Sequence, residues 1–200
     1  MKITSIPFLM TITRHLKFGS AGKLDNMEHI TILKHFKVIV GVYKIHGFKV
    51  SIILADNQFE SMRGSIADMG VLINVVSRVE HVPEIERYNH TIKERVQAQY
   101  NVLSFEHYQP MCIIEMVYLQ VFWRNMFALK GGISSTQSPS EIILNHRLNF
   151  NAHCKIEFGQ YAQTHEEHDN SMAACTVGAI ATRPTGNTQG GYYFIRLDTG

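Results

Sequence analysis

The first part of the chain alternates between stretches with strand character and one stretch with helical spacing. Residues 8–13 are rich in strand-forming side chains, which predicts a β-strand. From Leu24 onward apolar residues recur at three- and four-residue steps, and Gly47 predicts the end of that helix. Residues 49–55 are nearly all apolar, as in a buried strand of an α/β protein. This order places Asp56 at the carboxyl edge of a sheet, where sites in α/β proteins usually lie.

A helix over residues 82–102 has the most regular pattern in the chain. It follows a predicted short helix over residues 58–67 and a further predicted strand over residues 69–77. Two sets of its side chains recur at helical spacing, so each set occupies one face. The apolar set is Ile85, Tyr88, Ile92, Val96 and Tyr100, and the polar set is Glu86, His90, Lys93 and Gln97.

The remaining sequence has three parts that differ in composition and in hydrophobic pattern. Residues 110–129 are apolar around most of a helical circumference, which predicts a central helix. A Gly- and Ser-rich linker follows, and Ser138 then opens a short helix with proline in its first turn. Beyond Arg147 short β-like pieces alternate with turn residues. We therefore predict an α/β domain over 1–130, a linker and short helix over 131–147, and a small β-rich segment over 148–200.

The composition limits the class of protein and the cellular location that the sequence allows. The chain is 45% hydrophobic and 18% charged with a net charge of +2, which is typical of a globular protein and permits nucleic-acid binding without requiring it. Its three cysteines have no CxxC spacing, so we expect neither a disulfide framework nor a zinc module, and a reducing, intracellular location. The longest apolar runs are shorter than the ~20 residues that span a bilayer, and no signal-peptide pattern is present. We expect no membrane partner.

Asp56 and Glu86 are the candidate chemical groups. A strand that ends in one carboxylate, opposite a helix that carries another, is one way to bind divalent metal, and two such metals can support phosphoryl transfer. Lys93 lies two helical turns after Glu86, on the same face, where it could bind a substrate phosphate. The alternative is that Asp56 belongs to an ordinary turn and Glu86 is a solvated helix residue.

The residues around these groups resemble a known family. Residues 54–60 (LADNQFE), 80–87 (EHVPEIER) and 91–95 (TIKER), followed by Ser138-Pro139, are similar to the integrase catalytic core region of a copia-type LTR retrotransposon polyprotein. Residues 184–187 (PTGN) and 189–192 (QGGY) resemble the small β segment that follows that core. The resemblance implies an α/β, ribonuclease H-like fold over residues 1–130, with a mixed sheet flanked by helices and truncated at its first strand, and a small β-rich C-terminal appendage.

The resemblance also implies a chemistry. The family integrates DNA as a polynucleotidyl transferase acting on DNA phosphodiesters by a two-metal mechanism, with Mg²⁺ or Mn²⁺ held by an Asp, Asp, Glu triad. Asp56 and Glu86 match two catalytic and metal-binding positions of the triad, and Lys93, Arg87, Arg95 and Asn57 are the substrate-binding candidates. No acidic residue precedes Asp25, so the first aspartate is expected to be missing.

The resemblance further implies which partners to expect. They are DNA, as retroelement ends and target, and a possible homo-oligomer, in the nucleus. We therefore predict a retrotransposon integrase-core fragment that is inactive alone. The alternative is a non-catalytic nucleic-acid-binding or assembly module derived from the same fold.

Overall fold

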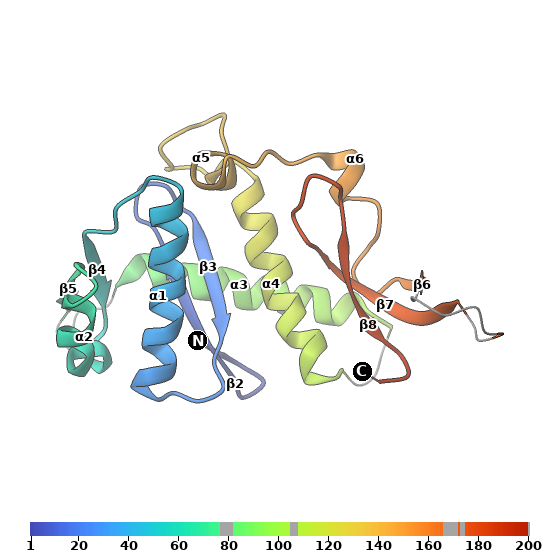
Figure 1. Ribbon diagram of the computed structural model, residues 1–200, viewed down its shortest axis with the longest axis horizontal. Coiled ribbons are helices and arrows are strands. Elements are labelled where there is room, and N and C mark those ends of the chain that lie inside the picture. Colours follow the sequence, from blue (N-terminus) through green and yellow to red (C-terminus); the bar gives the residue numbers. More distant parts are fainter. Residues whose placement is uncertain (77–81, 105–107, 166–171, 173–174, 200) are drawn as a thin grey trace. The chain divides into compact units, whose positions relative to one another are not determined.

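The computed structural model describes residues 1–76, 82–104, 108–165, 172 and 175–199 (Figure 1). These residues form two compact units. The first unit combines Met1–Glu94 with Trp123–Arg147, and the second combines Arg95–Phe122 with Leu148–Gly200. Helices and strands occur in both units, so the predicted α/β class is confirmed.

The first unit opens with an antiparallel hairpin. Strand β1 (Lys2–Ile3) pairs with β2 (Ile6–Ile12), and β2 pairs with β3 (Gly19–Lys23) in a register that runs from Phe8 opposite Lys23 to Ile12 opposite Gly19. The strand predicted over residues 8–13 is therefore present. Phe8, Leu9 and Met10 are all buried, so the middle of β2 is covered on both faces.

Helix α1 (His29–Ile45) follows the hairpin and leads into a parallel pair of strands, β4 (Ile52–Ala55) and β5 (Leu72–Val75). The helix ends as predicted, because Gly47 adopts a positive φ of 81° that a residue with a side chain rarely takes. Between the parallel strands the chain forms a 3₁₀ helix, η1 (Asn57–Met62), and a short helix, α2 (Arg63–Ala67). These two pieces occupy the stretch predicted as one short helix.

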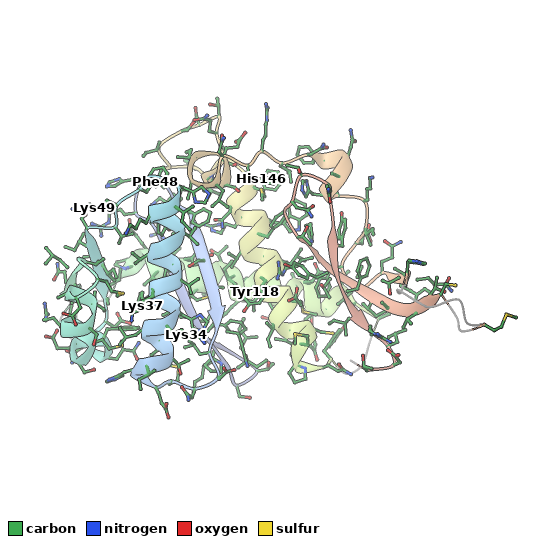
Figure 2. All side chains as sticks on the ribbon, in the orientation of Figure 1. Lys34, Lys37, Phe48, Lys49, Tyr118 and His146 are labelled. Atoms are coloured by element: carbon green, nitrogen blue, oxygen red, sulfur yellow. The ribbon has the colours of Figure 1, made fainter. Side chains whose placement is uncertain are left out.

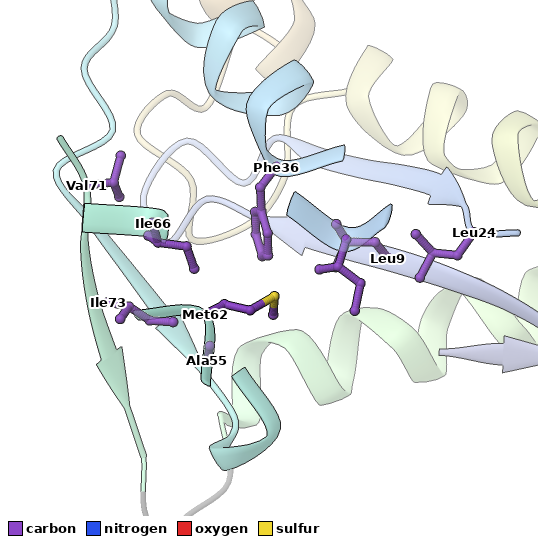
Figure 3. Packing of buried hydrophobic residues seen from close by; sticks show 9 residues of the cluster. Leu9, Leu24, Phe36, Ala55, Met62, Ile66, Val71 and Ile73 are labelled. Carbon is purple, nitrogen blue, oxygen red and sulfur yellow. The ribbon is translucent and has the colours of Figure 1, made fainter. Parts of the chain in front are cut away.

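One hydrophobic cluster joins these elements. Figure 3 shows Phe36 reaching down from α1, with Ile66 and Met62 on one side and Leu9 on the other. The cluster consists of Leu9, Leu24, Ile32, Phe36, Ala55, Met62, Ile66, Val71 and Ile73. Antiparallel and parallel strands thus pack on a common core. In the described part of the chain, β2 and β4 belong to separate sheets, β1-β2-β3 and β4-β5.

Two long helices follow, α3 (Pro83–Val102) and α4 (Pro110–Met126). The predicted apolar face of α3 is confirmed at Tyr88, Ile92 and Val96, which are all buried, whereas Tyr100 is 38% exposed. Helix α4 ends three residues earlier than the pattern predicted. Within the described residues, no helix combines the length and the apolar character that crossing a bilayer requires.

The predicted capped helix is α5 (Pro139–Leu144). The backbone N–H of Glu141 donates to Ser138 Oγ at 3.1 Å, and the backbone N–H of Ser138 donates to Glu141 Oε2 at 2.6 Å. These reciprocal bonds form a capping box, which satisfies two donors at the start of the helix.

The second unit contains the C-terminal β structure. Strands β6 (Tyr161–His165), β7 (Thr176–Pro184) and β8 (Tyr192–Arg196) form an antiparallel sheet in that order. A four-residue helix, α6 (Phe150–His153), precedes the sheet and was not predicted. It is held by buried His153, whose Nε2 lies 2.8 Å from the carbonyl oxygen of Asn187.

Candidate functional site

Asp56 lies where the sequence placed it, directly after β4. Its backbone is extended, with φ −72° and ψ 162°, and it is the N-cap residue of η1, although its side chain makes no capping hydrogen bond. The side chain is exposed to solvent. Because β4 is fixed by its pairing with β5 and by burial of Ala55, the Asp56 carboxylate is presented from a rigid strand end.

The amino group of Met1 lies within electrostatic reach of both Asp56 and Lys93. This amine donates to the carbonyl oxygen of Phe8 at 3.0 Å. Burial lowers its pKa below the usual value, nearby Lys93 lowers it further, and Asp56 acts in the opposite direction. The carboxylate and the lysine are 37 residues apart in sequence, yet both act electrostatically on the same amine. The structure therefore brings the predicted strand carboxylate and the predicted phosphate-binding lysine into one neighbourhood.

A cavity of about 720 Å³ adjoins Asp56. Residues 9–16, which include the end of β2, line one part of it, and residues 48–56, which include β4, line another. Phe36, Ile39, Val40 and Tyr43 contribute from α1. Phe48 and Lys49, which also line the cavity, lie just beyond the C-terminal end of α1 in Figure 2. The cavity is lined largely by apolar side chains, with Asp56 among its polar residues.

Glu84, rather than Glu86, is the α3 carboxylate that lines this cavity. Its Oε2 accepts a hydrogen bond from Arg14 Nε at 2.9 Å, and Lys17 Nζ lies 3.7 Å from Oε1. The hydrogen bond from Arg14 is the main reason that the pKa of Glu84 falls below its usual range. This ion-pair group was missed by sequence reasoning. The one local signal was the acidic first turn of α3, which contains Glu84 and Glu86. No local pattern links residues 14 and 84.

The other predicted site residues lie on exposed surface. Glu86, Arg87 and Lys93 are exposed on α3, on the side away from buried Tyr88 and Ile92. Asn57 begins η1 and is exposed next to Asp56, and exposed Arg95 belongs to the second unit. Of the sequence stretches that carried the family resemblance, residues 80 and 81 lie outside the described part of the chain.

A metal site requires more carboxylates than this neighbourhood supplies. Searched over the residues that the structure describes, the chain has no group of three His, Cys, Asp or Glu side chains placed to hold one metal ion. Neither of the predicted ligands, Asp56 and Glu86, belongs to such a group among these residues. The residues present do not fit the complete three-carboxylate centre that the family resemblance implies.

Comparisons with known proteins show similarity in fold to solved structures. No family model matches the sequence, and no curated protein matches it. Among solved structures, the fold is similar to the catalytic core domain of BIV integrase, with a TM-score of 0.49 and 14% sequence identity. The match covers 71% of this chain and 88% of the integrase core.

Proposed function

We propose that this chain is part of a ribonuclease H-like integrase core of the copia-type retrotransposon class, which contacts DNA phosphates and is catalytically incomplete alone. The observation that carries the proposal is that Asp56, which lines the cavity, and Lys93 both act electrostatically on the Met1 amine. A carboxylate at a strand end next to a cation on a neighbouring helix is suited to a phosphodiester substrate.

The polar and charged residues near Asp56 and on α3 have different roles in this proposal. Lys93 is exposed, so its ammonium can contact a DNA phosphate directly. Arg87 is exposed on the same helix and adds a second cation, and Asn57 places an amide beside Asp56. Arg14 and Lys17 are already paired with Glu84, so they neutralise a protein carboxylate rather than bind the substrate.

The proposed incompleteness is supported by the lack, among the described residues, of three metal-ligating side chains around one point. Divalent metal, Mg²⁺ or Mn²⁺, would supply charge stabilisation for phosphoryl transfer where a full ligand set holds it. No such set surrounds Asp56 among the described residues. We therefore expect the chain to bind DNA without turnover. The alternative, a non-catalytic binding or assembly module, also predicts no turnover.

Assays of 3′-processing and strand transfer with Mg²⁺ and with Mn²⁺ test this point, with wild type and Asp56→Asn measured side by side. The proposal predicts no turnover above background for either protein. Robust turnover that Asp56→Asn abolishes would contradict the proposed incompleteness and would show that the chain completes its own site. DNA binding measured on the same samples separates inactivity from failure to recognise the substrate.

A further inference from the structure

The outward face of helix α1 combines lysines with exposed apolar side chains. On its inward face the helix buries Ile32, Phe36 and Tyr43. The outward positions recur at three- and four-residue steps, so they form one continuous stripe along the helix. This α1 stripe consists of Ile30, Lys34, Lys37, Val38, Gly41, Lys44 and Ile45.

The α1 stripe is basic, and the helix itself supplies no acid to balance it. Helix α1 contains no aspartate or glutamate along its whole length. The three lysines of the stripe are exposed, with Lys34 and Lys37 one turn apart (Figure 2), and none of the three forms an ion pair with a described residue. Asp25 and Glu28 precede the helix, and Asp25 pairs with Lys23. The lysine ammonium groups are therefore available to the carboxylates of a partner.

Large apolar side chains alternate with these lysines. Ile30 is 79% exposed, Val38 61% and Ile45 81%. Removing such side chains from water is favourable, so a partner that covers them gains affinity. Phosphate contacts to the lysines would leave the three apolar side chains in water. The stripe as a whole therefore fits a protein surface better than a nucleic acid.

Gly41 lies at the centre of the stripe, and nothing in the fold requires a glycine there. A methyl group added at Gly41 would meet, among the described residues, no side chain and no main chain outside the helix within 4 Å. Glycine in the interior of a helix is less stable than alanine. It leaves the main chain of α1 open to close approach from outside, as when a second helix packs across the first.

The pattern of charge selects among the possible occupants. A second copy of this chain, packed on the same face about a two-fold axis, would place lysines against lysines. A helix that lies on a bilayer buries a continuous apolar face and keeps its cations at the border. In the α1 stripe, lysines and apolar side chains alternate around an open glycine. A helix with acidic and apolar side chains on one face matches the charge, the apolar area and the opening at Gly41 together.

We propose that the α1 stripe binds an acidic amphipathic helix of another protein. The carboxylates of that helix pair with the three lysines, and its apolar side chains cover Val38 and the two isoleucines. Its main chain crosses α1 at Gly41. The stripe lies wholly within the first unit and does not include Lys93, so this inference is independent of the proposed DNA binding.

Fluorescence anisotropy with the full chain tests the proposal. The probe is a labelled, capped helical peptide of about 18 residues, built from alanine with leucines and glutamates on one face. The double substitution Lys34→Glu/Lys44→Glu should weaken peptide binding at least about tenfold at low salt, because two attractive pairs become repulsive. Lys130→Glu/Lys155→Glu changes the net charge equally at exposed positions outside the stripe, and it should change the affinity less than about twofold.

Gly41→Ala separates a binding surface from a merely exposed helix. Alanine is the better helix former, so the substitution should raise the thermal midpoint by about 2 °C. The added methyl group obstructs close approach, so the same variant should bind the peptide about fivefold more weakly. A helix face without a partner would show the gain in stability and no loss of affinity.

The remaining arms make the result specific. A peptide with lysines in place of its glutamates should not bind. The proposal fails if the two charge-reversal variants bind the acidic peptide equally, if Gly41→Ala leaves the affinity unchanged, or if the lysine peptide binds as well. Displacement of the bound peptide by a short DNA duplex would also overturn it. So would binding to vesicles of anionic phospholipid that Lys34→Glu/Lys44→Glu abolishes, because in both cases the stripe would recognise phosphate.

Discussion

Asn125 on α4 and Gly19 at the start of β3 exchange two hydrogen bonds although they are 106 residues apart. The backbone N–H of Gly19 donates to Asn125 Oδ1 at 2.9 Å, and Asn125 Nδ2 donates to the carbonyl of Gly19 at 2.7 Å. Both residues are buried, and the side-chain amide therefore acts in place of a strand partner. The pair ties the end of α4 to the hairpin within the first unit.

Replacing Asn125 with alanine should lower the free energy of unfolding by about 3 kcal/mol, because two buried main-chain groups of Gly19 lose their partners. Urea unfolding measures the change. Asn101→Ala is the matched control, since Asn101 is exposed on α3, and it should change stability by less than about 0.5 kcal/mol. Equal effects of the two substitutions would refute the bridging role.

Tyr88 and Tyr43 offer a paired test of buried hydroxyl groups. Burial raises the pKa of both phenols, that of Tyr43 to about 12, and the Thr13 side chain partly offsets this rise at Tyr43. The Tyr88 hydroxyl is buried without a hydrogen-bond partner among the described residues. Tyr43→Phe should therefore cost about 1 kcal/mol, whereas Tyr88→Phe should leave stability unchanged or slightly raised.

Thermal and urea unfolding of both variants check this contrast. The Tyr88 ring stays in place in Tyr88→Phe, including its contact with the Arg124 guanidinium 5.5 Å from the ring centre. A loss of more than about 1 kcal/mol in Tyr88→Phe would mean that the hydroxyl has a partner after all.

Glu84 should make stability depend on pH on the acidic side. Because the hydrogen bond from Arg14 lowers its folded pKa, the native state binds fewer protons than the unfolded state between the two pKa values. Its contribution is fully present above the unfolded pKa, about 4.3, and is lost as pH falls through the folded pKa. Both partners are partly exposed, so we expect only about 0.5 kcal/mol at pH 7.

Unfolding of wild type and Glu84→Gln as a function of pH measures this contribution. The two proteins should differ at neutral pH and converge in acid. A stability difference that stays constant, or that grows as the pH falls, would contradict the ion pair with Arg14.

The capping box of α5 should contribute measurably to the stability of the protein. Ser138→Ala removes the acceptor for the Glu141 N–H and should cost about 1 kcal/mol. Ile143 of this helix is buried in a cluster with Phe18 and Tyr43. Loss of the cap should therefore lower the stability of the whole first unit. Ser135→Ala, at an exposed linker position, is the control. The prediction fails if the two alanine variants are equally stable.

Local patterns in the sequence predicted most of the elements. The buried positions of α3 followed from apolar spacing at Tyr88 and Ile92, and the start of α5 followed from Ser138 and Glu141, because the relevant contacts are three or four residues apart. These features could be predicted since helix geometry relates sequence spacing directly to position in space.

Contacts between distant residues could not be predicted in this way. The pairing of Arg14 with Glu84 and the bridge from Asn125 to Gly19 depend on how the elements pack, and nothing in the intervening sequence records either contact. The same reason explains why Asp56 was found from its strand while the cavity beside it was not. Predicted roles for Glu86, Arg87 and Arg95 stay predictions.

DNA binding by Lys93→Ala measures the central claim most directly. Affinity for a short duplex should be determined by filter binding at several salt concentrations for wild type, Lys93→Ala and the control Lys37→Ala, which removes an exposed lysine of α1 (Figure 2). Loss of one phosphate contact should weaken binding severalfold at low salt and reduce the slope of log K against log salt by about 0.9. Lys37→Ala should match wild type. No DNA binding by wild type at low salt, or identical affinities for wild type and Lys93→Ala, would contradict the account.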